Sequence, residues 1–248
     1  MTGLDEVLSI LNCNKRIGLD IGSRSTKAAV ESDGVILGIC DTPDFLEALG
    51  KGRLPEAKDV VTTGYGRHMY GSVSIPEIRA HTTGIVRSSD LHDCTILDIG
   101  GQDFKVIRVD GKGIRDFVMN DKCAAGTGRF LEKMSDILAM PLDELGNHTG
   151  GRKILESTCS VFTETEIISL MMEGVGRGEL AGGVIHSVYE RIRPYLRMYP
   201  MDILVLTGGV SSFKGLGDTF SNELDVEVIV PENARFMGAL GCMWSTKG

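Results

Sequence analysis

The chain of 248 residues is 42% hydrophobic and 24% charged, so it can bury one large core or two smaller ones. A net charge of −8 argues against nucleic acid or an anionic membrane as its main partner. No apolar run approaches the roughly 20 residues of a membrane-spanning helix, and the start lacks the basic region of a secretory signal, which together predict a cytoplasmic protein.

The first third of the chain alternates apolar strands with turn signals. Leu4 opens a predicted amphipathic helix that ends near residue 11. Predicted strands follow at 16–22, 27–31, 34–39 and 60–64. The Asp33-Gly34 pair favours a hairpin between the second and third of these strands, and residues 43–52 are expected to be a short helix or a loop.

The same order returns in the middle of the chain, where strands are predicted at 94–99, 104–109 and 113–119. Asp98 follows Asp20 by 78 positions, which indicates an internal repeat. The rest is predicted as helices at 126–140, 161–173 and 182–197, a strand at 202–206, a helix, a strand at 226–230 and a last helix from about residue 236. Four helix methionines are expected in the core: Met134, Met140, Met171 and Met172.

The segment 20–27 has the composition of a phosphate-binding loop. Gly22 lets the backbone approach an anion closely, and Asp20 can hold the waters around Mg²⁺. Hydroxyl donors are Ser23, Ser25 and Thr26. Lys27 either contacts the phosphates or is solvated on the emerging strand. Taken alone, the segment fits a plain hairpin with a hydrophilic tip equally well.

A second copy, at 98–105, favours the phosphate-binding interpretation. Asp98 again precedes glycines, here Gly100 and Gly101, and it is a second candidate for Mg²⁺ through water. Gln102 or Asp103 could position an attacking water, because phosphoryl transfer depends on positioning and charge neutralisation. Two such hairpins facing each other would hold a polyphosphate and its metal ion from both sides.

Small residues elsewhere offer bare backbone to a nucleoside. They are Thr207, Gly208 and Gly209 after a strand, Gly238 and Ala239 at the start of the last helix, and Gly126, Thr127 and Gly128. With these loops the chain resembles the actin-like ATPase superfamily of sugar kinases, heat-shock 70 chaperones and actin. That resemblance implies an α/β fold of two ribonuclease-H-like lobes that close on ATP or ADP. We expect one lobe at 1–89, joined by the helix at 236–247, and the other at 90–235.

Cys123 and Cys159 each precede a predicted helix, whose N–H groups and dipole would stabilise a thiolate. They lie 36 positions apart, whereas zinc and ferredoxin sites pair cysteines about two to four apart. They are either two buried structural thiols or two ligands that a symmetric dimer doubles to four. The remaining cysteines are expected to be small buried hydrophobes: Cys13, Cys40, Cys94 and Cys242.

Four motifs, at 63–67, 98–103, 120–130 and 157–162, closely resemble the activators (component A) of 2-hydroxyacyl-CoA dehydratases, a family that includes the ATPase subunits of benzoyl-CoA reductase. The likeness runs from about residue 16 to 244. It implies a homodimer with one shared [4Fe-4S] cluster, whose ligands fall on Cys123 and Cys159. It also implies ATP-dependent electron transfer from a ferredoxin or flavodoxin to an iron–sulfur dehydratase or reductase. Residues 1–15 extend beyond the family's usual start, and the segment before Val60 is short.

Two other functions fit the same loops. A small-metabolite kinase would leave both cysteines structural and would need a carboxylate base such as Asp103. A non-enzymatic nucleotide-sensing or assembly protein would bind nucleotide without hydrolysis or iron. The ordered match to four motifs favours the electron donor over both.

Overall fold

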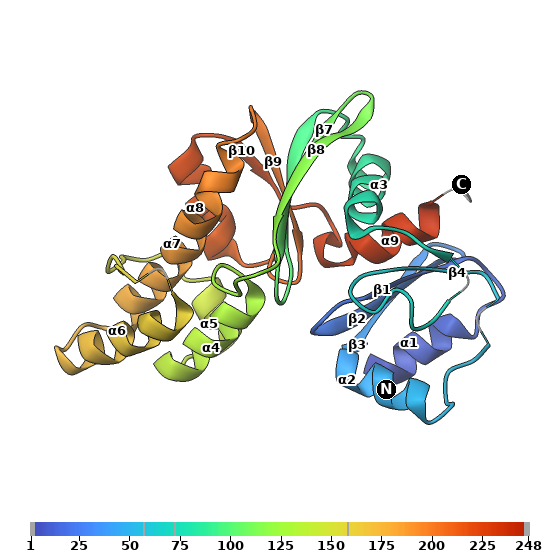
Figure 1. Cartoon of the computed structure of the whole chain (residues 1–248), viewed down its shortest axis with the longest axis horizontal. Coiled ribbons are helices and arrows are strands. Elements are labelled where there is room, and N and C mark those ends of the chain that lie inside the picture. Colours follow the sequence, from blue (N-terminus) through green and yellow to red (C-terminus); the bar gives the residue numbers. More distant parts are fainter. Residues whose placement is uncertain (1–2, 57, 72, 158, 246–248) are drawn as a thin grey trace. The chain divides into compact units, whose positions relative to one another are not determined.

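The computed structural model describes residues 3–56, 58–71, 73–157 and 159–245 (Figure 1). The chain divides into two compact units, one formed by Met1–His92, Val109–Arg115 and Pro231–Gly248 and the other by Asp93–Arg108 and Asp116–Val230. Thr158 of the second cysteine motif and residues 246–247 of the expected last helix lie outside the described residues. Within those ranges, no helix has the length and apolar character needed to cross a membrane.

The first unit is built on a sheet of strand order β3-β2-β1-β4-β5. Its strands are β1 (Ile17–Ile21), β2 (Ser25–Glu31), β3 (Val35–Asp41), β4 (Val60–Thr63) and β5 (Val73–Ser74). β2 pairs antiparallel with β3, so the predicted hairpin is confirmed, and β1 pairs parallel with β4, the predicted buried strand at 60–64. The uncertain segment after β3 is a helix, α2 (Thr42–Gly50), with Pro43 in its first turn.

Helices cover both faces of this sheet. They are α1 (Gly3–Leu11), α3 (Glu77–Ser89) and α9 (Met237–Trp244), the last preceded by the 3₁₀ turn η1 (Ala234–Phe236). α1 approaches closely at Gly38, where a Cβ would lie 2.9 Å from Ile10 Cδ1. α9 packs at Gly18, where a Cβ would overlap Ala239 O. Because Gly38 and Gly18 pair with successive residues of β2, these two contacts lie on opposite faces.

The second unit contains a sheet of strand order β8-β7-β6-β9-β10. Its strands are β6 (Cys94–Ile99), β7 (Phe104–Asp110), β8 (Gly113–Asn120), β9 (Ile203–Gly208) and β10 (Glu227–Ile229). β9 pairs parallel with both β6 and β10. The strand order is that of the first sheet, and the 78-residue repeat matches β6, β7 and β8 to β1, β2 and β3.

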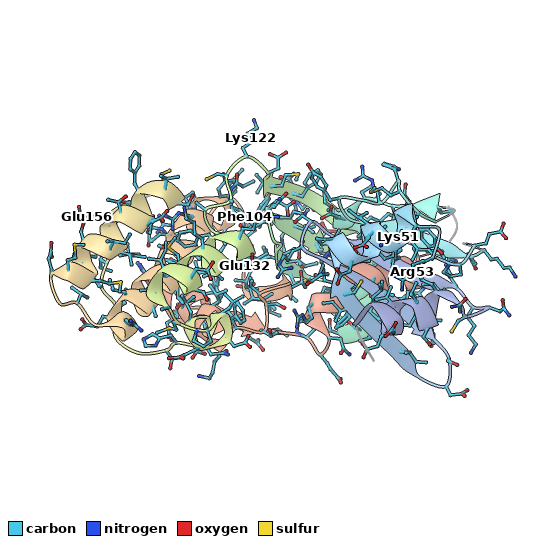
Figure 2. The ribbon with its side chains drawn as sticks, turned by 90° about the horizontal axis from the view of Figure 1, so that it is seen from below. Lys51, Arg53, Phe104, Lys122, Glu132 and Glu156 are labelled. Atoms are coloured by element: carbon cyan, nitrogen blue, oxygen red, sulfur yellow. The ribbon has the colours of Figure 1, made fainter. Side chains whose placement is uncertain are left out.

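Helices of the second unit pack around one core, in which Phe104 of β7 is fully buried (Figure 2). They are α4 (Gly128–Leu138), α5 (Leu142–Gly146), α6 (Ser160–Met172), α7 (Arg177–Leu196) and α8 (Lys214–Leu224). α7 begins earlier than predicted, at Arg177, and its Gly182 and Gly183 pack closely against the backbone at 151–153.

α6 departs most from the expected burial. Of its residues, only Thr163 and Ile167 are buried, while Val161, Phe162, Ile168 and Met172 are exposed. The prediction that Met172 lies in the core is wrong, since 84% of its surface is accessible. An apolar pattern at helical spacing therefore does not mark a core face here.

Candidate nucleotide and cysteine sites

The first candidate loop follows β1, where a carboxylate and an ammonium group lie together below the surface. Asp20 and Lys27 are both buried, and Lys27 Nζ lies 3.4 Å from Asp20 Oδ2. Strand register explains the pairing, because the two residues are directly opposite in the β1–β2 ladder. The alternative that Lys27 is solvated is therefore wrong.

Backbone groups and threonine hydroxyls hold this loop by hydrogen bonds. Gly22 N–H donates to Ser25 O at 3.2 Å, and Thr42 Oγ1 donates to Gly22 O at 2.7 Å. Thr26 is fully buried, with its hydroxyl 3.0 Å from that of Thr42, so it supports the loop from inside. Ser23 and Ser25 are partly accessible and keep their hydroxyls near the loop surface.

The second candidate loop repeats this arrangement after β6. Lys105 Nζ lies 3.6 Å from Asp98 Oδ2 and 2.7 Å from Asp103 Oδ2. Gly100 N–H donates to Asp103 O at 2.9 Å, as Gly22 does to Ser25 in the first loop. Lys105 was not among the site residues predicted from the sequence. Its position seven residues after Asp98 matches that of Lys27 after Asp20, and this repeat was the available signal.

The carboxylate of Asp98 is further held by β9, since Thr207 Oγ1 donates to Asp98 Oδ1 at 3.3 Å. The two residues suggested to position water differ in their surroundings. Asp103 is engaged by Lys105, whereas Gln102 is exposed at the loop tip. Gln102 is thus the less constrained of the two.

A glycine with positive φ closes each loop. Gly64 (φ 90°) follows β4, and Gly208 (φ 92°) ends β9. A Cβ on Gly64 would lie 2.6 Å from Asp20 Oδ1, and one on Gly208 would lie 2.6 Å from Asp98 Oδ1. Gly209 has open space where a Cβ would stand, so its backbone can be approached.

The start of α9 lies against the first carboxylate. A Cβ on Gly238 would be 2.9 Å from Asp20 Oδ2 and 3.0 Å from His81 Nε2. Ala239 is fully buried on β1 and therefore packs the helix rather than facing an open surface. The structure brings Gly238 to the predicted site residue Asp20.

The second loop is bonded to the segment that carries Cys123. Gly128 N–H donates to Gly100 O at 2.9 Å, and Arg129 N–H donates to Gly101 O at 3.0 Å. Thr127 Oγ1 also donates to Gly101 O at 3.0 Å. Gly126, Thr127 and Gly128 are buried, so these predicted site residues connect the loop to α4.

Both motif cysteines are exposed, so the alternative of two buried structural thiols is wrong. Cys159 is the N-cap of α6, and the N–H groups of Val161 and Phe162 lower the pKa of its thiol. Cys123 lies in the loop before Thr127, the N-cap of α4, so the prediction of a helix N-terminus is wrong for this cysteine.

The Cys123 loop has its own support. Asn120, the last residue of β8, donates from Nδ2 to Cys123 O at 3.0 Å. Lys122 projects outward beside it (Figure 2). Within the described ranges, no three His, Cys, Asp or Glu side chains meet as a metal site.

The other cysteines divide into two classes. Cys40, Cys94 and Cys242 are buried as predicted, and burial raises the pKa of Cys40 and Cys94 to about 11. Cys13 is exposed, so the prediction that it is buried is wrong. It follows the end of α1 and donates to Ser9 O at 3.7 Å.

Arg191, on α7, belongs to no sequence motif, yet it contacts the segments that carry both cysteines. Its Nη2 donates to Ser157 O at 3.1 Å and to Thr163 Oγ1 at 3.2 Å. Its guanidinium carbon lies 4.6 Å from the ring centroid of Phe130 on α4. No local pattern could have signalled these contacts, because the partners lie 28 to 34 positions away for the two hydrogen bonds.

Both thiols act electrostatically on Arg191. Burial lowers the pKa of Arg191, whereas the charges of Cys123 and Cys159 act in the opposite direction. Glu166 fixes the chain before Cys159 by accepting N–H groups of Glu156 at 2.7 Å and Ser157 at 2.9 Å. Burial raises the pKa of Glu166, but these hydrogen bonds outweigh it and leave the pKa lowered.

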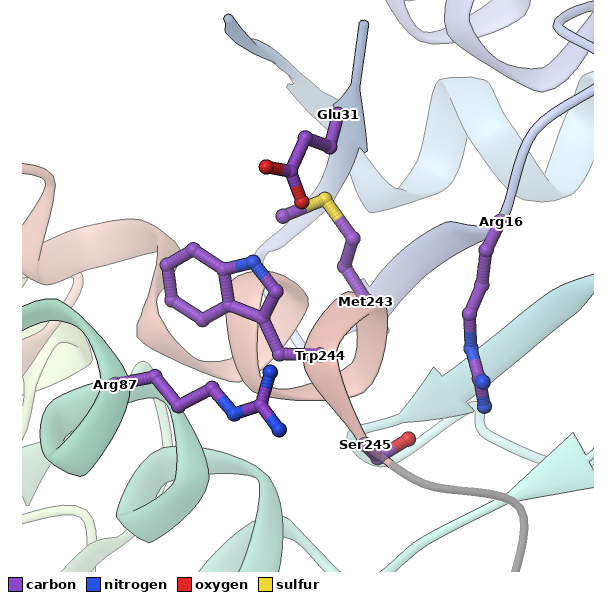
Figure 3. A pocket seen from close by; sticks show the side chains of 6 residues that line it. All are labelled: Arg16, Glu31, Arg87, Met243, Trp244 and Ser245. Atoms are coloured by element: carbon purple, nitrogen blue, oxygen red, sulfur yellow. The ribbon is translucent and has the colours of Figure 1, made fainter.

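A pocket of about 510 Å³ opens in the first unit, where Arg16 precedes β1 (Figure 3). It is lined by Arg16, Glu31, Arg87, Met243, Trp244 and Ser245. None of the predicted site residues lines it.

The chain is similar to known proteins over most of its length. Residues 44–244 match the BadF/BadG/BcrA/BcrD ATPase family. The activator of lactoyl-CoA dehydratase from Anaerotignum propionicum is 38% identical over 246 residues, covering 91% of this chain and 94% of that protein.

Two solved structures share the fold. The activator of the 2-hydroxyisocaproyl-CoA dehydratase from Clostridium difficile, with bound ADPNP, has a TM-score of 0.83 at 33% identity and 92% coverage of both chains. Component A of (R)-2-hydroxyglutaryl-CoA dehydratase from Acidaminococcus fermentans has a TM-score of 0.80 at 31% identity, covering 92% of this chain and 95% of that one. The predicted actin-like α/β fold is thereby confirmed. The chain belongs to the BadF/BadG/BcrA/BcrD ATPase family.

Proposed function

We propose that the chain is an ATP-dependent one-electron donor. Two copies hold one [4Fe-4S] cluster, with Cys123 and Cys159 of each copy as ligands. The electron acceptor is an iron–sulfur enzyme, either a 2-hydroxyacyl-CoA dehydratase or a related reductase. The observation that carries this proposal is a pair of exposed cysteines beside a helix that is hydrogen-bonded to a phosphate-type loop.

The cysteine surroundings fit such a cluster. Both thiols are exposed, and the helix N-terminus favours the thiolate of Cys159, which is the form that binds iron. Two copies supply the four ligands that a cubane cluster needs. Apolar side chains on α6 offer a surface to the second copy: Val161, Phe162, Ile168 and Met172 are 59%, 67%, 41% and 84% exposed. The cluster would supply the one-electron chemistry.

The nucleotide is proposed to bind at the phosphate-type loops, and the two lobes are proposed to be 1–89 with 236–247 and 90–235. Asp20 and Asp98 would hold Mg²⁺ through water, each already oriented by a lysine. Gln102 would orient the attacking water, since the Asp103 carboxylate is engaged by Lys105. The bound ADPNP in the Clostridium difficile relative supports a nucleotide in this fold.

Coupling between nucleotide and electron transfer needs a physical connection. Gly128 and Arg129 donate backbone hydrogen bonds to Gly100 and Gly101, so a shift of the second loop moves the start of α4. The Cys123 loop leads directly into that helix. ATP can drive transfer only if its two nucleotide states differ in acceptor affinity or cluster potential. A ferredoxin or flavodoxin would then return one electron for each one passed on.

The test compares two exposed cysteines. Oxygen-free wild-type protein, Cys159→Ala and Cys13→Ala are each mixed with dithionite, ATP and the 2-hydroxyisocaproyl-CoA dehydratase of the Clostridioides difficile relative. Dehydratase activation should require ATP, disappear in Cys159→Ala and persist in Cys13→Ala. Activation by Cys159→Ala at the wild-type rate would sink the proposal.

A further inference from the structure

We propose that Arg191 is the residue that positions the cysteine ligands and sets the charge around the shared cluster. Its hydrogen bonds hold the chain on both sides of Cys159, and its guanidinium favours the more negative charge state of the group bound there. This role rests on the cluster of the proposed function. Arg191 belongs to α7, which carries neither cysteine.

The hydrogen bonds surround Cys159. Arg191 Nη2 reaches Ser157 O at 3.1 Å, two residues before the cysteine, and Thr163 Oγ1 at 3.2 Å, four residues after it. Thr163 is fully buried, and its hydroxyl donates to Cys159 O at 2.9 Å. One guanidinium therefore organises the carbonyl groups that determine where the Cys159 side chain starts.

The same side chain touches the segment that carries the other ligand. Its guanidinium lies over the Phe130 ring, 4.6 Å from the centroid. A Cβ on Gly126 would be 3.4 Å from Arg191 Cβ and 3.8 Å from Arg191 Cδ. Gly126 has φ +88° and follows Cys123 by three positions. Arg191 thus contacts both the α4 segment and the α6 segment.

The charge has a direct consequence for reduction. Adding an electron makes the cluster and its thiolates more negative, and a nearby fixed cation stabilises that state. Arg191 is half-buried, so water screens its charge less than that of a surface arginine. Arg193, two residues later, is a matched control, because it pairs with Glu190 at 2.7 Å and makes none of the contacts described.

The first measurement is the reduction potential of the anaerobic holo-dimer, titrated with ADP present and followed by electron paramagnetic resonance. Arg191→Gln should lower the equilibrium constant for one-electron reduction at least tenfold, which corresponds to a potential about 59 mV more negative. Arg191→Lys keeps the charge and should stay within twofold of wild type. An unchanged potential in Arg191→Gln, or an equal shift in Arg193→Gln, would overturn the role.

The second measurement separates positioning from charge. Both hydrogen bonds come from Nη2, and a lysine side chain ends one bond short of that atom and lacks the planar group that lies over Phe130, so it cannot keep both in the same geometry. Arg191→Lys should therefore release iron to a chelator at least tenfold faster than wild type, whereas Arg193→Gln should not. The positioning role can also be measured without a cluster. In cluster-free protein, amides at 153–163 should exchange hydrogen at least tenfold faster in Arg191→Lys than in wild type. An exchange rate in Arg191→Lys equal to that of wild type would overturn the positioning role. A lack of iron in the wild-type protein would instead defeat the proposed function.

Discussion

Asp20 and Asp98 end equivalent strands, each with a lysine seven positions later and a positive-φ glycine against its carboxylate. A buried carboxylate is costly unless a cation or hydrogen bond compensates it. The lysines meet that need, and the glycines bring a neighbouring strand end within van der Waals reach. The shape of each loop therefore depends on three residues: the aspartate, the lysine and the glycine.

Adjacent glycines after β9 give a matched pair of variants. Gly208→Ala should lower the free energy of unfolding by about 1–3 kcal/mol. Gly208 has a positive φ, which alanine adopts only with strain, and the added Cβ would overlap Ile99 O. Gly209→Ala should leave stability within about 0.5 kcal/mol, since nothing lies within 4 Å of its Cβ position. Urea unfolding of both variants measures this, and equal losses would refute the difference.

The Gly209→Ala variant also probes the nucleotide site. If a nucleoside packs on the bare backbone at this turn, the added methyl should weaken ATP binding about tenfold without unfolding the chain. Isothermal titration with ADP and ADPNP measures the affinity. Wild-type affinity in this variant would remove Gly209 from the site.

His186 on α7 connects pH to stability. Burial, followed by the nearby Arg152, lowers its pKa below the ordinary value of 6.5, although Glu223 and Glu190 lie 3.6 and 3.8 Å from Nε2. The unfolded chain therefore binds a proton at His186 more readily than the folded chain does. The contribution of this histidine to stability is complete above pH 6.5 and is lost as the pH falls through the folded pKa.

Urea unfolding between pH 7.5 and about 5 tests the histidine. Wild-type protein should lose more stability on acidification than His186→Gln, in which the titrating group is gone. Parallel curves for the two proteins would show that His186 contributes no pH dependence.

Single residues differ in how far their sequence context reveals them. The Asp-Ile-Gly segments follow apolar strands, so Asp20 and Asp98 could be identified from local pattern alone. The burial of Lys27 could not, because it depends on the register with β1. Arg191 could not either, since its partners come from two other segments brought together only by packing.

At the scale of elements, α1 is an integral part of the first unit. Val7, Ile10 and Leu11 are nearly inaccessible and join the core formed by β1, β2 and α2. The helix packs where Gly38 exposes the backbone of β3. The extension beyond the family's usual start thus completes a hydrophobic face.

Two neighbouring positions of α1 test that role. Ile10→Ala should destabilise the protein by about 2–4 kcal/mol, because a fully packed side chain leaves a cavity. Ser9→Ala, on the exposed side of the same helix, should change stability by less than about 0.5 kcal/mol. A thermal or urea midpoint equal in both variants would mean that α1 is dispensable.

Helix existence was easier to predict than helix burial. The amphipathic pattern at 4–11 predicted both for α1, because its apolar residues form one narrow face. α6 has apolar residues on several sides, so periodicity located the helix without indicating which side chains are exposed. Cys123 shows a further limit, since Gly126 has a positive φ and α4 begins only at Gly128.

At the scale of the whole molecule, the repeat organises the chain. The second sheet has the same strand order as the first. In each sheet, one strand leads into a loop where an aspartate pairs with a lysine. The 78-residue offset made β6, β7 and β8 predictable from β1, β2 and β3, whereas β9 and β10 lie outside it. The exposed apolar side of α6 lies on the helix that Cys159 caps.

That exposed surface makes dimerisation testable. Phe162→Asp should raise the dimer dissociation constant at least tenfold, because it places a charge in an apolar contact. Met198→Asp changes an apolar side chain of similar exposure outside α6 and should not. Sedimentation equilibrium under nitrogen measures both, and equal effects would argue against α6 as the contact.

The most direct measurement is iron and acid-labile sulfide content, with molar mass, on protein purified without oxygen. A shared cluster predicts about four of each per dimer, lost in Cys123→Ala and in Cys159→Ala and retained in Cys13→Ala. A monomer without iron under the same conditions would contradict the central claim and leave a nucleotide-binding ATPase fold whose exposed cysteines need another explanation.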